Sequence, residues 1–315
     1  MRIFITGATG LIGRTLVPDL LAHGHEVIAL ARNDASRAML HAMRTTPIFG
    51  QGRDVAQLAE ALTGVDAVVH LATTIPSQDS AVEDEWVYSE EVMVGLLRNL
   101  IAAGVQAGVR RVIFPSLYAV YGDHGEEWVT EETPTAPGDL FEPYARAEAH
   151  LYRASQAHGL GVVVLRMGLL YSADAQHTKG LLYGLKRGQV PIMGNGNMFW
   201  PLLHVADAAT AIRLTLEQVL PPGAVLFNVC DNEPVRCGQL YYDLARWLEA
   251  PPPQRHTGQP TDDFNPYQGQ IKIAALRTSV RLSNRKIRER LHFTPQYTTY
   301  REGFRAVLDA VAQAL

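Results

Sequence analysis

Three glycines near the start of the chain have the spacing of a phosphate-binding turn. Gly7, Gly10 and Gly13 lie in the stretch TGATGLIG (6–13), directly after the apolar run RIFIT. Glycine at the first two positions lets the backbone turn sharply and approach a phosphate, and glycine at the third lets a helix pack closely on a strand. The helix that follows would begin with free N–H groups and the positive end of its dipole, which favour anions. The sequence therefore predicts a dinucleotide-binding strand–turn–helix unit.

The end of the second apolar run predicts which dinucleotide is bound. EVIALA (26–31) ends in Ala31 and is followed by Arg32. An acid at this point would bind the ribose hydroxyls of NAD and repel a 2′-phosphate, whereas a guanidinium forms paired hydrogen bonds with phosphate. The sequence therefore favours NADP(H), with Arg37 as a second cation nearby. NAD(H) stays as the alternative, because Arg32 can also be an ordinary surface residue.

The pattern along the rest of the chain indicates the elements that position these residues. Apolar, β-branched runs predict strands at 2–6, 26–31, 67–72, 111–116, 161–166 and 225–230. Helical spacing predicts helices at 87–107 and 143–158, the second ending near Gly159, with further helices after residue 204. Buried strands separated by helices are typical of a doubly wound parallel sheet, an α/β Rossmann fold. We expect an NADP-binding domain over 1–170, with 204–230 returning to it, and a smaller C-terminal substrate lobe over 171–203 and 231–315.

Composition argues against several classes of partner. The 315 residues carry a net charge of −4 with scattered basic residues, which argues against a nucleic-acid groove or a polybasic membrane patch. No apolar run reaches the roughly 18 residues of a membrane span, and no signal peptide is recognisable before the first strand. Cys230 and Cys237 are too few for a disulfide framework and lack metal-ligand spacing. We expect a cytoplasmic protein without a metal site.

Motifs along almost the whole chain resemble those of the extended or atypical short-chain dehydrogenases/reductases, the group that contains nucleotide-sugar epimerases and dehydratases. The motifs are TGATGLIG, DAVVHLAT (66–73), SLYAVYG (116–122), PYARAE (143–148), LRMGLLY (165–171), HVADAA (204–209) and SNRKIRERLHFTPQYTTYREGF (283–304). The resemblance implies a Rossmann fold, a nicotinamide dinucleotide and an oxidoreductase or epimerase reaction. It does not imply a substrate.

The resemblance also implies where the cofactor is held. The pyrophosphate would lie along Gly7, Thr9, Gly10, Leu11 and Ile12, with Gly13 behind them. The adenine would meet Gln51 or Asp54, between which the sequence does not decide. The cofactor's ribose would lie along Leu71, Ala72 and Thr73, and its nicotinamide end along the backbone of Met167, Gly168 and Leu169.

The implied catalytic centre departs from the family pattern in two ways. Tyr144 matches the catalytic tyrosine, but the catalytic serine or threonine falls on Leu117, and Ser116 stands one residue earlier. A one-residue shift along a strand reverses the direction of a side chain, so Ser116 can substitute only if the strand has ended before it. Glu148 occupies the place of the lysine that normally lies one helical turn after the tyrosine.

These departures favour reduction over oxidation. A carboxylate near a phenol raises the pKa of the phenol, and an unassisted tyrosine of pKa about 10 is a poor base at neutral pH. A neutral Tyr144 can still donate a proton to a carbonyl oxygen. We therefore expect an NADPH-dependent reductase, with Glu148 either a second acid–base group or an ordinary helix residue. The alternatives are an epimerase that replaces the lysine from another segment and a non-catalytic NADP(H)-binding or sensing protein.

The sequence says less about the substrate-binding residues and the quaternary structure than about the cofactor site. The residues expected along the substrate are Thr74, Tyr118, Tyr121, His177, Lys179 and Trp200. Trp200 stands where related sugar-nucleotide enzymes have a phosphate-binding arginine, which favours a smaller or more apolar carbonyl compound. His204 and Asp207 are expected to pack and cap the helix that follows. The helices at 87–107 and 143–158 resemble those that pair in family dimers, so we expect a homodimer.

Overall fold

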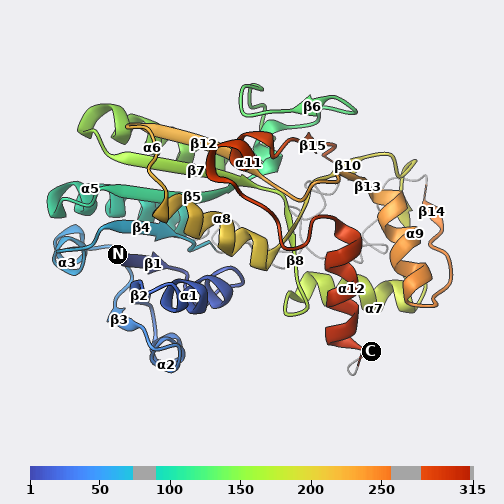
Figure 1. Cartoon of the computed structure of the whole chain (residues 1–315), viewed down its shortest axis with the longest axis horizontal. Coiled ribbons are helices and arrows are strands. Elements are labelled where there is room, and N and C mark those ends of the chain that lie inside the picture. Colours follow the sequence, from blue (N-terminus) through green and yellow to red (C-terminus); the bar gives the residue numbers. More distant parts are fainter. Residues whose placement is uncertain (74–89, 257–277, 313–315) are drawn as a thin grey trace.

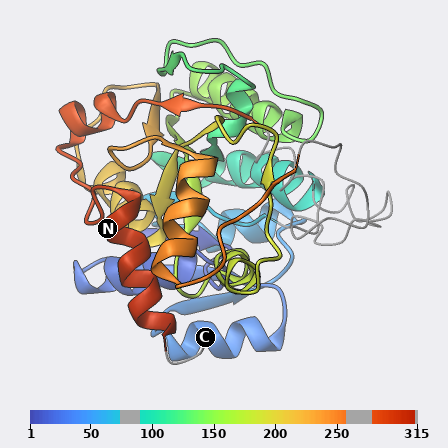
Figure 2. The ribbon, with the colours of Figure 1, turned by 90° about the vertical axis from the view of Figure 1, so that its right-hand side faces the viewer.

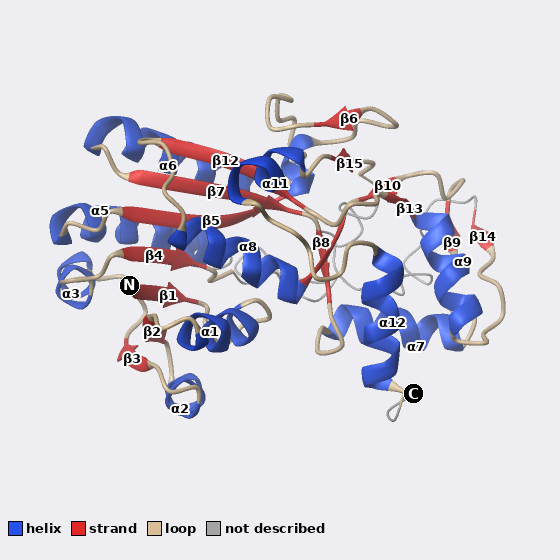
Figure 3. Ribbon diagram, viewed as in Figure 1, coloured by secondary structure: helices blue, strands red, loops and turns tan. Residues whose placement is uncertain are grey.

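A seven-stranded parallel sheet forms the centre of the computed structural model, which describes residues 1–73, 90–256 and 278–312 (Figures 1 and 3). The strand order is β12-β7-β5-β4-β1-β2-β3. The strands span β1 Arg2–Thr6, β2 Glu26–Ala31, β3 Thr46–Phe49, β4 Ala67–His70, β5 Arg111–Leu117, β7 Gly161–Met167 and β12 Ala224–Val229. The order reverses between β1 and β4, and ligands of such sheets bind outside the carboxyl ends of the strands at that point. The predicted α/β Rossmann fold is confirmed.

Helices cover both faces of this sheet because the strands are apolar on both. One face packs on α1 (Gly13–Ala22), α2 (Asp34–Ala42), α8 (Val205–Glu217) and α11 (Arg285–Leu291). The other packs on α3 (Val55–Ala61), α5 (Leu96–Ala107) and α6 (Glu142–His158). Gly159 ends α6 in the left-handed conformation (φ 66°), as its position after the periodic segment predicts.

Two local features of the sheet region were not predicted. β3 contains Pro47, which cannot donate a ladder hydrogen bond, and the strand is tolerated because it lies at the sheet edge. The helix expected at 87–107 begins, in its described part, with a single π-helical segment, Glu91–Gly95, before α5. π-Helical turns are rare and are frequent at functional sites. Residues 87–89 lie outside the described ranges.

A smaller lobe is built from the segments after β7. Its helices α7 (Gln176–Lys186), α9 (Cys237–Trp247) and α12 (Tyr300–Val311) share one apolar cluster, and Figure 2 looks onto them. The short strands pair as β8 (Leu169–Tyr171) with β11 (Leu202–His204), β10 (Phe199–Trp200) with β13 (Val235–Arg236), β9 (Ile192–Met193) with β14 (Arg255–His256) and β15 (Arg281–Leu282) with β6 (Trp128–Val129). The predicted domain boundaries stay a prediction.

Three side chains of the C-terminal segment, including Phe293, join the core of the main sheet. Ile287 and Leu291 of α11 are buried in the apolar cluster of α1 and α8, so this helix packs with the nucleotide-binding layers. No helix of the described ranges has the length and apolar character that crossing a membrane requires.

Candidate functional site

A cavity of about 1230 Å³ runs from the glycine turn to the smaller lobe. One end is lined by the turn after β1 and by the ends of β2 and β4. The middle is lined by the π-helical segment, the end of β5 and the start of α6, and the far end by α7, β10 and α9. It therefore lies at the carboxyl ends of the strands, at the point where the strand order reverses.

The three glycines of the turn differ in what surrounds them. Gly7 has a φ of 71°, and a Cβ built on it would lie 2.6 Å from the backbone nitrogen of Ala72. A Cβ on Gly13 would lie 2.4 Å from the carbonyl oxygen of Ala8, so this glycine permits close packing of α1. A Cβ on Gly10 would meet only the Gly7 carbonyl oxygen, at 3.1 Å, and otherwise open space. The open side of Gly10 is the cradle that a phosphate would fill.

The start of α1 leaves donors free for such a phosphate. Leu11 and Ile12 line the cavity, and within the described chain their backbone N–H groups form no hydrogen bond. No acidic residue stands in the first turn of α1. Free N–H groups and a helix N-terminus favour an anion, so this end of the cavity fits a dinucleotide diphosphate.

The structure distinguishes Gln51 from Asp54, the two residues proposed to contact the adenine. Gln51 lines the cavity, whereas Asp54 does not. The Asp54 carboxylate instead caps α3 by accepting hydrogen bonds from the backbone N–H groups of Ala56 and Gln57, at 2.8 and 3.2 Å. Arg32 lines the cavity, is exposed, and forms no ion pair within the described residues. Arg53, which sequence reasoning missed, also lines it and pairs with Glu91 at 3.2 Å.

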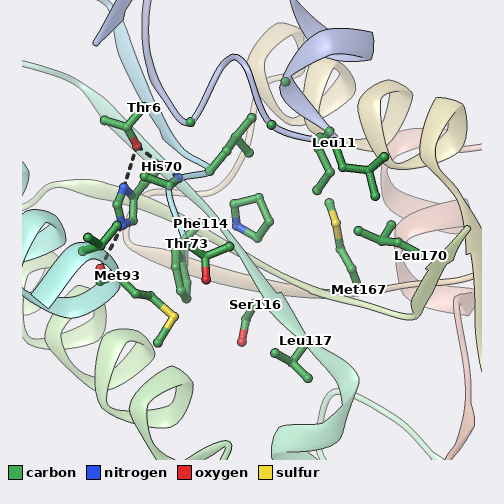
Figure 4. A pocket seen from close by; sticks show the side chains of 18 of the residues that line it. Thr6, Leu11, His70, Thr73, Met93, Phe114, Ser116, Leu117, Met167 and Leu170 are labelled. Atoms are coloured by element: carbon green, nitrogen blue, oxygen red, sulfur yellow. Dashed lines mark hydrogen bonds between the residues drawn. The ribbon is translucent and has the colours of Figure 1, made fainter. Parts of the chain in front are cut away.

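A buried histidine fixes the end of β4, which is another feature missed in the sequence. His70 Nε2 lies 2.8 Å from the Met93 carbonyl oxygen, and Nδ1 lies 2.7 Å from Thr6 Oγ1 (Figure 4). Since a carbonyl only accepts, Nε2 carries the proton, and Thr6 donates to Nδ1. Burial lowers the pKa of His70 to about 4. This neutral histidine lines the cavity and ties β1, β4 and the π-helical segment together.

The cofactor-ribose and nicotinamide residues all border the cavity where they are described. These are Leu71, Ala72, Thr73, Met167, Gly168 and Leu169. A Cβ on Gly168 would lie 2.4 Å from the Pro201 carbonyl oxygen, so glycine is required there by the close approach of another backbone segment.

Tyr144 and Ser116 both line the middle of the cavity. We expected Ser116 to be able to take the place of Leu117 only if the strand ended before Ser116. β5 continues through Leu117, so that condition is not met. Alternation along β5 instead places Ser116 on the same face as Val112 and Phe114, in the layer covered by α6. Its Oγ is buried and has no hydrogen-bond partner among the described residues.

Tyr144 is buried among apolar side chains, with 7% of its surface exposed. Burial raises the pKa of its phenol, and the Thr73 side chain opposes part of that rise. The expected direction of the pKa shift therefore agrees with the structure, but its cause is burial. Glu148 does not contribute to it.

Glu148 does not line the cavity and forms a buried ion pair. Its Oε1 accepts a hydrogen bond from Arg166 Nε at 3.1 Å, and its Oε2 accepts one from Arg166 Nη2 at 2.6 Å. Arg166 comes from β7 and lies with its guanidinium over the Tyr121 ring, 4.4 Å from the ring centroid. The carboxylate that replaces the family lysine is therefore paired with a cation from another segment and does not border the cavity.

The expected substrate residues divide between the cavity and its surroundings. Tyr118, His177 and Trp200 line the cavity, and His177 Nε2 donates to the Leu170 carbonyl oxygen at 2.7 Å. Tyr121 and Lys179 do not line it, and Tyr121 donates its hydroxyl hydrogen to Asn228 at 2.7 Å. Thr74 lies outside the described residues.

The charged groups of the cavity lie toward one end. The lining residues Arg32, Arg53, Glu91 and Arg98 come from the end of β2, the loop after β3 and the region of α5. Among the described residues, no Lys or Arg lines the end at the smaller lobe. That end is apolar and aromatic, and Trp200 contacts Tyr241 edge to face with centroids 5.6 Å apart. No group of three or more His, Cys, Asp or Glu in the described ranges has the arrangement of a metal site.

His204 caps the helix that follows as expected, whereas Asp207 binds the backbone of another segment and does not cap that helix. His204 Nδ1 caps α8 by accepting from the Ala206 N–H at 3.2 Å. Asp207 accepts from the backbone N–H groups of Gln296 and Tyr297, which fastens α8 to the segment before α12.

Comparison with known proteins agrees with this architecture. The NAD dependent epimerase/dehydratase family matches residues 3–230. The chain belongs to this family. A relative from Streptomyces, 3-diazoavenalumate denitrifying reductase, is 29% identical over 308 residues, which cover 96% of this chain and 99% of that protein. The sterol-4-alpha-carboxylate 3-dehydrogenase (decarboxylating) of Dictyostelium discoideum is 26% identical over 250 residues, or 77% of this chain and 75% of that protein.

A solved structure has the same fold. The UDP-glucose 4-epimerase of Thermus thermophilus, in complex with NAD, superposes with a TM-score of 0.78 at 24% identity and covers 100% of both chains. The family expected from the sequence is thus confirmed by the family model, and the likeness of the structures extends over the whole fold.

Proposed function

We propose that this protein is an NADPH-dependent reductase of apolar carbonyl compounds. The observation that carries the proposal is the buried Ser116 hydroxyl, which lacks a partner in the described chain and borders the same cavity as Tyr144. An unsatisfied buried hydroxyl costs on the order of 1–3 kcal/mol, which a substrate oxygen would recover by accepting its hydrogen bond.

The cofactor proposal is supported by the fit of the glycine cradle and the exposed guanidinium beside it. The open side of Gly10 and the free N–H groups of Leu11 and Ile12 would hold the diphosphate. Arg32, with no acid at Ala31, would hold a 2′-phosphate and so favour NADPH over NADH. The solved Thermus relative binds NAD, which supports a nicotinamide dinucleotide in the same cradle. When bound, NADPH would supply the hydride for the carbonyl carbon.

The chain's own residues would supply the proton and hold the substrate. Tyr144 is a neutral phenol at neutral pH, since an ordinary tyrosine has a pKa of about 10 and burial raises that of Tyr144 further. It can therefore donate a proton to the carbonyl oxygen as the hydride arrives. Ser116 would donate a hydrogen bond to the same oxygen and stabilise the negative charge that develops there. Reduction never requires Tyr144 to begin as a phenolate, which agrees with the absence of a cation at position 148.

The apolar end of the cavity supports an apolar substrate body. A sugar nucleotide brings a diphosphate, whose binding calls for cations, and within the described residues no Lys or Arg lines the end at the smaller lobe. Trp200, Tyr241 and Leu181 offer aromatic and aliphatic surface there instead. Two relatives named as a reductase and a sterol dehydrogenase are consistent with such substrates.

A steady-state comparison of substrates tests this function. NADPH consumption at 340 nm would be followed with aryl and alkyl ketones, and C4 epimerisation of UDP-glucose would be followed in parallel. We expect NADPH to be consumed with at least one class of apolar ketone and no epimerisation. Epimerisation of the sugar nucleotide without ketone reduction would refute the proposal. Homodimerisation through α5 and α6 and a cytoplasmic location stay predictions.

A further inference from the structure

The π-helical segment, Glu91–Gly95, forms one side of the middle of the cavity. All of its residues except Val94 line the cavity, and the segment leads directly into α5. We propose that His70 is a positioning residue that holds this segment in the form that receives the dinucleotide. The inference rests on the dinucleotide site of the proposed function and is independent of the reaction that follows.

A chain of hydrogen bonds runs from the end of β4 through His70 to the middle of the segment (Figure 4). The Ala72 N–H donates to Thr6 Oγ1 at 3.3 Å, and the Thr6 hydroxyl donates to His70 Nδ1 at 2.7 Å. His70 Nε2 completes the chain by donating to the Met93 carbonyl oxygen at 2.8 Å. Since a backbone N–H and a carbonyl oxygen fix the two ends, the groups between them all donate in one direction. His70 Nε2 is therefore a committed donor to Met93.

The sheet fixes the direction of that donor. The pairing of β1 with β4 places Thr6 beside His70. The imidazole lies against the Phe114 ring of β5, with ring centroids 6.0 Å apart and ring planes at 19°. His70 is only 1% exposed, so water does not compete for its N–H group. Three neighbouring strands therefore set the position of the Met93 carbonyl oxygen.

The π-helical segment depends on this contact from outside its own helix. π-Helical turns are rare, and a side chain that bonds into a helix ladder distorts the helix locally. Among the described residues, no other side chain bonds to the backbone of Glu91–Gly95. The Glu91 side chain pairs with Arg53, but the two side chains are 50% and 64% exposed, so this ion pair contributes little.

The adenine side of the cavity is held by other contacts. Asn99 Nδ2 of α5 donates to the Gly52 carbonyl oxygen at 3.0 Å. A Cβ on Gly52 would lie 2.3 Å from Leu96 Cδ1, so the start of α5 packs closely on the loop after β3. Loss of the His70 contact should therefore loosen the middle of the cavity and leave the adenine side in place. A segment that is loose before binding must be ordered by the dinucleotide, which lowers the affinity.

Two variants with side chains of similar length and volume test the hydrogen bond. In His70→Gln the side-chain amide can still donate to the Met93 carbonyl oxygen, whereas His70→Met offers no donor. Both variants lose the imidazole and its acceptor for the Thr6 hydroxyl. The difference between them therefore isolates the bond to Met93 from the packing of the ring.

Deuterium exchange of the backbone amides of residues 91–99, followed by mass spectrometry in the unliganded protein, reports on the segment itself. We expect exchange to be about tenfold faster in His70→Met, the effect of one hydrogen bond, and close to wild type in His70→Gln. By calorimetry, the Kd for whichever of NADPH and NADH binds wild type more tightly should rise about tenfold in His70→Met and less than about threefold in His70→Gln. ADP, which carries only the adenine half and the diphosphate, should bind both variants as it binds wild type.

His204→Asn is the matched control. His204 is also a partly buried histidine, it lies outside the cavity lining, and asparagine keeps an acceptor for the Ala206 N–H at the start of α8. This variant should leave both the exchange of residues 91–99 and the dinucleotide Kd unchanged.

The outcomes separate the inference from the function on which it rests. The role of His70 is overturned if His70→Met matches wild type in exchange or in dinucleotide Kd, if His70→Gln is no better than His70→Met, or if ADP binding weakens as much as dinucleotide binding. If exchange responds as expected but wild type binds neither NADPH nor NADH, the hold of His70 on the segment stands and the cofactor proposal fails.

Discussion

Removing the charge of Glu148 should destabilise the fold without harming the chemistry. In Glu148→Gln, the Arg166 guanidinium would stay buried without a counter-charge. Glu148 and Arg166 are only 3% and 5% exposed, so solvent cannot replace the lost carboxylate. The ion pair is bidentate, at 3.1 and 2.6 Å, which makes both of its hydrogen bonds dependent on the same carboxylate.

The size of the effect follows from this burial. Breaking a buried pair by removing one partner costs about 3–5 kcal/mol, and glutamine keeps one acceptor, so we expect a loss of about 3 kcal/mol in the free energy of unfolding. An unfolding entropy of about 2.1 cal/mol/K per residue gives roughly 0.66 kcal/mol/K for this chain length, and hence a Tm lower by about 4–5 °C. The double variant Glu148→Leu with Arg166→Met removes both charges and should recover most of the loss.

The assay combines thermal unfolding with cofactor titration and ketone reduction. Neither residue lines the cavity, so the Kd for NADPH and the kcat of Glu148→Gln should stay within about threefold of wild type at a temperature where the variant is folded. Glu148→Lys would set two cations against each other and should be less stable still. Unchanged stability of Glu148→Gln together with a loss of turnover would refute this reasoning and make Glu148 an acid–base group.

Three further predictions concern the nucleotide half of the site. Burial lowers the pKa of His70 to about 4, below the unfolded value of about 6.5, so the unfolded chain binds the proton first and stability falls as pH falls from about 6.5 to 4. In urea unfolding, His70→Gln should lose up to about 3 kcal/mol less stability than wild type over this pH range, and an equal loss in both would contradict the prediction. Gly10→Ala should fold normally, because only the Gly7 carbonyl oxygen lies near its new Cβ. It should nevertheless lower the dinucleotide affinity measured by calorimetry at least about tenfold, and an unchanged Kd would exclude a phosphate beside Gly10. Arg32→Ser should weaken NADPH about tenfold or more and spare NADH, whereas an equal effect on both would remove the 2′-phosphate contact.

Much of the fold could be predicted from the sequence because its signals are local. The parallel strands are short runs of apolar residues, and the glycine turn carries its requirement in its spacing, which Gly7 and Gly13 show by the backbones that press on them. β3 was not predicted because its short sequence, TPIF, contains a proline, which is tolerated only in an edge strand. The periodicity of apolar residues does not show whether a strand lies at the edge of the sheet.

The chemistry of the site depended on contacts between distant segments. Sequence reasoning could place Glu148 one turn after Tyr144, but it could not show that Arg166 reaches it from β7. The sequence showed that Ser116 stands one residue before the family position at Leu117. It could not show which face of β5 meets α6, because that depends on how the layers pack.

The most direct test of proton donation by Tyr144 is a single turnover of ketone reduction. Enzyme preloaded with NADPH would be mixed rapidly with an aryl ketone, and the loss of absorbance at 340 nm would be compared between wild type and Tyr144→Phe. The loss of a general acid is expected to slow this step by about 10²–10⁴-fold while the NADPH affinity stays unchanged. A Tyr144→Phe variant that oxidises NADPH as fast as wild type would contradict the central claim.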